Sequence, residues 1–420
     1  METLDFPTQF DESFVNDINE RIMIKEVEYL NQKHYQNTSL VDSLVRLIKK
    51  DQIINELYPN QLEILHQCSL NEGGFINCEN RKIIYKYIIN LLYKPKNQGA
   101  DEFVQVSNEM NTEYKTRDII IKDCDRSVLY SLLNEYYKDS PDAKQNEDFC
   151  IVNKNEEGSA KIENDSSKKE ISKEDCKKYL YNLRYFVRQS LGENIDYEYY
   201  QGYQDLALYF MILFGKEGID LLYKFNKIFL DEYLKETKMK TKNFDDYLTT
   251  LTDCLKLIDN NVNEDIFKIT KTKPYYSLSW LITWFSHKND SLFNQFRLMD
   301  YFITSSFTEI YFYSGEVIIS EYNKFVKGIK GSTPQEDLED MDLMGNLFIH
   351  FQELKISGIN ADELILKTEQ DKNNHKVTEN IEMVHEKKDN KEPLFNIGSL
   401  LLLLSLLISL FYMDFTRQVC

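Results

Sequence analysis

The segment Tyr199-Tyr200-Gln201-Gly202-Tyr203-Gln204-Asp205 leads directly into Leu206–Phe214, a run of nine apolar residues that Gly215 closes. Nine residues of helix are only about 14 Å long, which is too short to cross a bilayer. We therefore expect this run to form a helix buried in the protein core, and the quoted segment to form the loop that enters it.

The composition of the chain also favours helices. Hydrophobic residues make up 42% of the 420 residues, enough for a substantial core and for two or three domains. Glycine and proline are scarce, with 14 and 7 residues, whereas β-sandwiches and barrels need many tight turns. These numbers predict an all-α fold.

Charge and cysteine content argue against two classes of site. The formal net charge is −19, and nucleic-acid backbones are bound by clustered lysine and arginine, so we expect no nucleic-acid partner. The seven cysteines are scattered, without a C-x-x-C pair or histidines at zinc spacing, so we expect no metal site and a reducing compartment. The first residues also lack the basic and apolar regions of a signal peptide.

An earlier segment, Ile120-Ile121-Lys122-Asp123-Cys124-Asp125-Arg126, carries a second set of polar residues. Asp123 and Arg126 are three positions apart, so on a helix the carboxylate and the guanidinium share a face and can pair. Alone, such a pair is usually a surface ion pair worth under ~1 kcal/mol. Tyr199-x-Gln201-Gly202 alone is usually an ordinary loop. Neither segment alone therefore indicates a function, and the interpretation of both depends on the other motifs in the chain.

Two further motifs flank these segments in the sequence. Gly73-Gly74-Phe75-Ile76 supplies a sharp entry into a helix. Tyr276–Phe285 contains both tryptophans of the chain, and it is followed by His287 and then by Arg297-Leu298-Met299-Asp300. We expect most of these residues to be structural, as part of an aromatic helical core.

In this order, the four motifs resemble the fingerprints of the TBC domain, which are G-G-[LI], I-x-x-D-x-x-R, Y-x-Q-G, and L-x-W-L-I-T-W-F-x-H followed by R-L-[YM]-D. The resemblance covers roughly residues 70 to 366. The long form of the tryptophan run, with His287, looks most like the tail-anchored branch of the family. Cys124 departs from the family, which often has an aliphatic residue there, but a small thiol can fill the same space.

The resemblance implies an activity and a partner. Proteins of the TBC family accelerate GTP hydrolysis by Rab-type small GTPases, and an arginine and a glutamine enter the partner's nucleotide site. By this resemblance, Arg126 neutralises charge that grows on the phosphate oxygens, and Gln201 orients the attacking water. The partner is then a Rab GTPase in its GTP-bound form, which carries GTP and Mg²⁺ itself, so the chain needs no cofactor.

Arg126 and Gln201 are called the arginine finger and the glutamine finger below, because residues of this kind are inserted into the partner. Four other residues are expected to hold these two fingers in position. In the family, the aspartate at the position of Asp123 is thought to hold the arginine ready. Tyr199 and Gly202 are expected to shape the loop of Gln201, with Gly202 permitting a close backbone approach. Asp205 lies near the same loop in the sequence and is a further candidate for orienting it.

Changes in composition predict the domain organisation. Residues 138–176 contain few apolar side chains and cannot offset the entropy lost on ordering, so we expect a flexible insertion. The TBC family usually has a shorter gap here, but a looped-out insertion costs little because closure entropy grows only with the logarithm of length. The expected parts are an amino-terminal helical extension (1–67), the TBC domain (68–367), a cytosolic stalk (368–393), a transmembrane tail anchor (394–413) and a luminal tail (414–420).

The expected anchor, Leu394–Met413, has twenty residues without a charge, which as a helix would span the ~30 Å core of a bilayer. A buried core helix is the alternative interpretation. Lys387, Lys388 and Lys391 precede this segment and favour a cytosolic location for the body of the protein. Resemblance to the tail-anchored branch implies a membrane of the endoplasmic reticulum or early Golgi.

Two other functions stay open on sequence alone. The chain could be a non-catalytic, membrane-anchored scaffold or tether that binds GTP-loaded Rab proteins, or a tail-anchored structural protein with unrelated helices. A scaffold would need neither Arg126 nor Gln201, and unrelated helices would not give these motifs in this order. The leading hypothesis is therefore a GTPase-activating protein for a Rab protein of the early secretory pathway.

Overall fold

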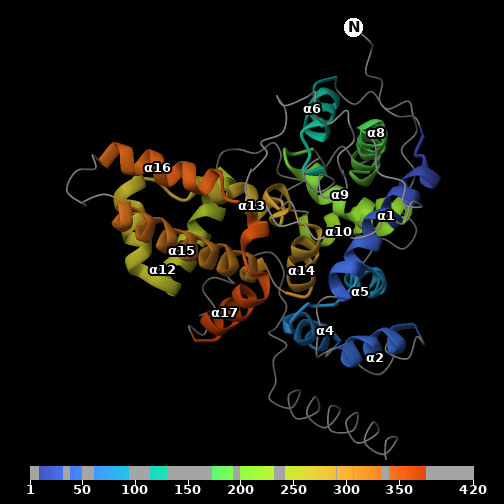
Figure 1. Ribbon diagram of the computed structural model, residues 1–420, viewed down its shortest axis with the longest axis horizontal. Coiled ribbons are helices and arrows are strands. Elements are labelled where there is room, and N and C mark those ends of the chain that lie inside the picture. Colours follow the sequence, from blue (N-terminus) through green and yellow to red (C-terminus); the bar gives the residue numbers. More distant parts are fainter. Residues whose placement is uncertain are drawn as a thin grey trace, which may run out of the picture.

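The structure is a computed structural model, and it describes residues 9–31, 38–49, 61–93, 114–129, 173–192, 199–230, 242–289, 291–305, 307–332 and 340–374. All regular secondary structure in these ranges is helical, which confirms the expected all-α fold. Figure 1 shows two groups of helices that meet at α13 and α14, with α6, α8 and α9 in one group and α12, α15 and α16 in the other.

The first group contains most of the amino-terminal helices. Its elements are α1 (Glu12–Asn31), α2 (Thr38–Lys49), α4 (Gln61–Leu70), α5 (Cys78–Leu92), α6 (Tyr114–Asp125), α8 (Lys173–Ser190), α9 (Tyr203–Phe214), the 3-10 helix η2 (Gly215–Glu217), α10 (Gly218–Phe225) and the π-helix η3 (Asn226–Leu230). The following elements are α12 (Lys242–Thr270), η4 (Tyr275–Ser277), α13 (Leu278–Ile282), η5 (Ser286–Lys288), α14 (Leu292–Phe302), α15 (Phe307–Ser332), α16 (Asp340–Gln352), η6 (Ile356–Gly358) and α17 (Ala361–Asn374). A kink at Asp259 interrupts α12.

The central helix of the first group is α9. All its residues from Tyr203 to Leu213 are buried, which confirms the predicted core helix and extends it toward the amino end. The helix begins after Gly202, whose φ is 99°, and ends at Gly215, whose φ is 57°. Both glycines have a positive φ, which other residues rarely adopt. The glutamine loop is thus attached to the most buried helix of this group.

The amino-terminal helix α1 shares this core. Its residues Val15, Ile18 and Ile22 are at most 2% exposed, and the side-chain amide of Asn19 donates to the carbonyl of Met211 in α9 at 2.8 Å. Fully burying a valine or isoleucine side chain contributes about 1.5–3 kcal/mol each. α1 therefore helps to hold α9 in place.

A buried ion pair joins α5 to α14. The guanidinium of Arg81 lies 3.0 Å from Asp300 Oδ2, and both side chains have no exposed area. The same oxygen accepts from the amide of Phe75 at 3.0 Å, and Tyr85 donates to Asp300 Oδ1 at 2.6 Å. A Cβ at Gly74 would lie 2.4 Å from Oδ2, so the glycine motif lets the backbone approach this carboxylate.

The tryptophan run is an irregular segment and not one continuous helix. Trp280 and Trp284 are at most 1% exposed. α13 ends at Ile282, and Trp284 and Phe285 follow with φ of 51° and 65°. The amide of Phe285 donates to the carbonyl of Trp280 at 2.8 Å. This turn ends the helix and directs η5, which carries His287, toward α9.

Two predicted boundaries are wrong. α8 begins at Lys173, so residues 173–176 are helical and outside any flexible insertion, and the fully buried Cys176 supplies an apolar contact that the prediction overlooked. α17 continues to Asn374 with Thr368 fully buried, so residues 368–374 belong to the folded domain and not to the stalk. The expected anchor at 394–413 lies outside the described residues. Among the residues that are described, no helix has the length and apolar character needed to cross a membrane.

Candidate functional site

Helix α6 places Arg126 at the surface. Ile120, Ile121 and Cys124 are buried, whereas Lys122 and Arg126 are exposed. The helix therefore packs one face onto the core and leaves the other face open, as expected for an amphipathic helix. Arg126 comes directly after the last helical residue, so it projects from the end of the element.

The predicted pairing of Asp123 with Arg126 is present. Arg126 Nη2 donates to Asp123 Oδ1 at 2.5 Å, and Nε donates to the carbonyl of Lys122 at 3.2 Å. The carboxylate is only 3% exposed, yet the arginine side chain is 67% exposed. A buried carboxylate thus holds one nitrogen of the guanidinium, while most of the arginine side chain remains accessible to a partner.

The loop of Gln201 presents that residue to solvent. Gln201 is exposed, whereas its neighbours Tyr200 and Gly202 are buried. Tyr200 donates to the carbonyl of Ile282 at 2.7 Å. A Cβ at Gly202 would lie 2.7 Å from Cγ2 of Thr283, so only glycine fits there without displacement. The two fixed neighbours leave Gln201 as the outward position of a well-supported turn.

Tyr199 connects the two motifs. Its hydroxyl lies 2.9 Å from Asp123 Oδ2 and 2.5 Å from Gln204 Oε1. Gln204 Oε1 also accepts from the amide of Gly202 at 3.0 Å. The residue that holds Arg126 and the residue that fixes the Gln201 loop therefore share one hydrogen-bonding partner. α6 and α9 also pack against each other (Figure 1).

Asp205 forms a second connection beneath the first. This fully buried carboxylate accepts from Ser127 Oγ at 2.8 Å and from the Val128 amide at 3.1 Å, just after Arg126 in the chain. Its other oxygen lies 3.1 Å from Gln204 Nε2 and 2.7 Å from His287 Nδ1. Asp205 therefore joins the end of α6, the start of α9 and η5.

Two buried residues of the site, Tyr199 and Cys124, have raised pKa values. Burial, together with the nearby charge of Asp123, raises the pKa of the Tyr199 hydroxyl well above its ordinary value. The phenol therefore stays protonated and acts as a donor at physiological pH. Burial also raises the pKa of the Cys124 thiol, so this cysteine is an unreactive packing residue.

The structure brings all the candidate residues into one region. Asp123, Tyr199, Gly202 and Asp205 lie in one hydrogen-bond network that includes Arg126, and Gln201 directly precedes Gly202 of this network. Sequence reasoning missed the roles of Gln204, Ser127 and His287. Gln204 was visible as a polar residue in the first turn of an apolar helix, and its partners Tyr199, Gly202 and Asp205 all lie within five residues of it.

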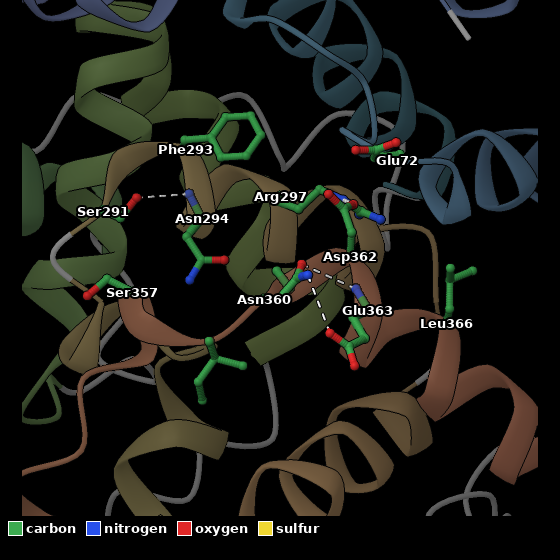
Figure 2. Close-up of a pocket in the computed structure, with 12 residues that line it drawn as sticks. Glu72, Ser291, Phe293, Asn294, Arg297, Ser357, Asn360, Asp362, Glu363 and Leu366 are labelled. Carbon is green, nitrogen blue, oxygen red and sulfur yellow. Dashed lines mark hydrogen bonds and ion pairs between the residues drawn. The ribbon is translucent and has the colours of Figure 1, made fainter. Parts of the chain in front are cut away.

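A separate hollow lies between α14 and the start of α17 (Figure 2). Its volume is about 400 Å³, and none of the predicted site residues lines it. Arg297 Nε donates to Asp362 Oδ1 at 2.5 Å there, and Nη2 donates to the carbonyl of Asn71 at 3.2 Å. These contacts assign Arg297 to the packing of α14, α17 and the segment before α5.

Over part of its length, the chain is similar to TBC1 domain family member 20. The proteins from Bos taurus and Homo sapiens are each 30% identical over 114 residues, and the protein from Mus musculus is 30% identical over 116 residues. The matched segment covers 27% of this chain and 27% of each relative, so the similarity spans about a quarter of their length. No protein-family model matches the chain. The similarity is distant and partial, and it points to the same family as the motifs.

Proposed function

We propose that this protein is a GTPase-activating protein for a Rab-type small GTPase, and that Arg126 and Gln201 are its catalytic residues. One observation carries the proposal: a buried network centred on Tyr199 holds both the exposed Arg126, through Asp123, and the backbone amide next to the exposed Gln201, through Gln204. An ordinary surface ion pair would not need a buried carboxylate with a second donor from another element.

Arg126 is well placed to bind and neutralise the phosphate of a nucleotide that the partner GTPase carries. A guanidinium offers several donors in a planar fork and stays charged when water is removed from it. Asp123 restricts its rotamers before the partner arrives, which lowers the entropy lost on binding. Charge stabilisation of this type accounts for much of the rate increase that activators give to small GTPases.

Gln201 suits the second requirement, which is to orient the attacking water. Its amide can donate to one group and accept from another at the same time. The left-handed Gly202 and the buried Tyr200 hold the backbone on both sides of it. A side chain on a fixed backbone is more effective for positioning water than one on a mobile loop.

We also propose that residues 394–413 anchor the protein in a membrane of the endoplasmic reticulum or early Golgi. Twenty residues without a charge and the lysines before them support this proposal. Rab proteins act on membranes, so an anchor on the same surface would raise the effective concentration of the two partners. Fractionation of cells that express the full chain or a chain truncated at 393 tests it, and equal membrane association of the two forms would contradict it.

The activity is tested by single-turnover GTP hydrolysis with the full chain and a panel of GTP-loaded Rab proteins. We expect faster hydrolysis with at least one of them, and a large loss of stimulation for Gln201→Ala. A control is Arg21→Ala, because Arg21 also forms an ion pair with an aspartate of its own segment, Asp17, but belongs to α1 and not to either finger motif. Binding of GTP-loaded Rab without any stimulation would support a scaffold or tether instead.

A further inference from the structure

His287 is a half-exposed residue that links η5 to the glutamine loop. Its Nδ1 lies 2.7 Å from Asp205 Oδ2, and its side chain is 34% exposed. Its backbone amide lies 3.4 Å from Oγ1 of Thr283. The ring therefore has a fixed, partly exposed position beside Asp205 and the backbone that follows Gln201.

The first route from His287 to Gln201 is direct packing. A Cβ added at Gly202 would lie 2.7 Å from Cγ2 of Thr283 and 4.0 Å from Cγ of His287. The backbone of Gly202 therefore rests on the segment that includes these two side chains. Because Gln201 directly precedes Gly202, a shift of this segment would move the base of the glutamine side chain.

The second route is a chain of hydrogen bonds. Asp205 Oδ2 accepts from both His287 and Gln204, and Gln204 Oε1 accepts from the amide of Gly202 at 3.0 Å. Bonds to a buried carboxylate are among the stronger ones, and removing a donor leaves the charge short of partners. Loss of His287 would therefore disturb Asp205 and, through Gln204, the Gly202 amide.

The arginine side of the site has its own support. Arg126 is held by Asp123 Oδ1 and by the carbonyl of Lys122, and neither of these contacts involves His287. Asp205 reaches this side through Ser127 and the Val128 amide, and through the longer path of Gln204, Tyr199 and Asp123. His287 is therefore placed to act mainly on the glutamine.

We propose that His287 is a positioning residue for the Gln201 finger, acting through its hydrogen bond to Asp205 and its packing beside Gly202. The inference rests on the proposed function, because it assigns His287 to the same reaction. It goes beyond that proposal because the histidine is outside both finger motifs. In sequence, it lies 86 residues after Gln201.

Three variants separate the effect of the His287 hydrogen bond from the effect of its ring packing. The rate constant of single-turnover hydrolysis is measured for each with the best-stimulated Rab protein. His287→Ala should lower the stimulated rate constant by about 10-fold or more, as expected when a buried carboxylate loses a donor. His287→Asn should recover most of this loss, because its Nδ2 can take the place of Nδ1. His287→Phe retains a ring beside Gly202 but donates nothing, so it should stay close to His287→Ala.

A double-mutant cycle tests whether the effect passes through the glutamine. In a Gln201→Ala chain, the added His287→Ala change should alter the remaining rate constant by less than about 2-fold, since coupled residues are not additive. His350→Ala is the matched control. His350 Nε2 also lies near a carboxylate, 3.3 Å from Glu321, with 31% of its side chain exposed, but it belongs to α16 in the other group of helices (Figure 1).

Hydrogen exchange of the peptide that covers residues 199–205 provides a readout that needs no GTPase. We expect faster exchange there in His287→Ala and unchanged exchange in His350→Ala. Unchanged exchange in His287→Ala, a wild-type rate constant, or an equal fold-loss with and without Gln201 would overturn the proposal. If no Rab protein is stimulated by the wild-type chain, the proposed function fails, while the exchange measurement still tests whether His287 holds the loop.

Discussion

The hydroxyl of Tyr199 lies 2.9 Å from Oδ2 of Asp123, a residue 76 positions earlier in the chain. The other oxygen of that carboxylate holds Arg126 at 2.5 Å. Tyr199 also contacts Gln204, which binds the amide next to Gln201. Tyr199 therefore contacts both Asp123, which holds Arg126, and Gln204, which holds the backbone next to Gln201.

Tyr199→Phe should lower Rab GTP hydrolysis by about 10-fold while the protein stays folded. The change removes one hydroxyl from a buried network, which costs about 1 kcal/mol of stability and leaves Asp123 and Gln204 with one partner fewer. Single-turnover rates and a thermal melt measure the two effects. Tyr275→Phe is the control, because that hydroxyl also faces a carboxylate but its residue is 52% exposed. Equal rates for the two variants would contradict the role of Tyr199.

Gly202→Ala should impair activation more strongly than it impairs stability. The φ of 99° and the 2.7 Å approach to Thr283 both oppose a side chain, so the loop must shift. Strain of this kind costs about 1–3 kcal/mol. Gly345→Ala in α16 is the control, because a Cβ there meets nothing within 4 Å, and it should be neutral or stabilising by up to about 1 kcal/mol. Denaturant unfolding compares the two, and full activity of Gly202→Ala would show that the loop position is unimportant.

Asp300→Asn should lower the free energy of unfolding by about 3–5 kcal/mol, because it leaves the fully buried Arg81 without its charged partner. The matched control is Glu217→Gln, whose partner Lys86 is 51% exposed. A surface pair of that kind contributes under about 1 kcal/mol. Urea unfolding distinguishes the two cases. Similar small losses for both variants would mean that Asp300 does not join α5 to α14 as described.

Glu316→Gln should change how stability depends on pH. Burial raises the pKa of Glu316 to about 7 from an ordinary 4.5, and the carboxyl of Asp371 adds to the shift against the opposing effect of Lys367. Since the folded state holds this proton more tightly, the contribution of Glu316 is favourable below about pH 4.5 and is lost as the pH rises through about 7. Unfolding at about pH 5 and about pH 8 should show a larger loss for wild type than for Glu316→Gln. An equal pH dependence would rule out this titration.

Local features of the molecule were predictable from the sequence. The run Leu206–Phe214 has no polar residue, so a buried helix was the natural outcome. The three-residue spacing of Asp123 and Arg126 was enough to predict their pairing, because Asp123 lies in the last turn of α6 and Arg126 directly follows that helix. The scarcity of glycine and proline was enough to predict helices throughout the described residues.

The long-range contacts could not be predicted in the same way. Arg81 and Asp300 are 219 positions apart, and nothing in either segment identifies the other as its partner. His287 and Asp205 are 82 positions apart, and their contact depends on the turn that brings η5 toward α9. The start of α8 was missed because Lys173, Glu174 and Asp175 are polar, although acidic residues favour the first turn of a helix and Cys176 is fully buried.

We propose that the exposed guanidinium of Arg126 acts on the nucleotide of a partner GTPase. The most direct test is the single-turnover rate of GTP hydrolysis by a stimulated Rab protein with Arg126→Ala and Arg126→Lys chains. Because the side chain is 67% exposed, both variants should fold normally. We predict a loss of about 10³-fold for Arg126→Ala and little recovery for Arg126→Lys, since an ammonium cannot reproduce the planar fork. Near-normal stimulation by a folded Arg126→Ala chain would contradict the account.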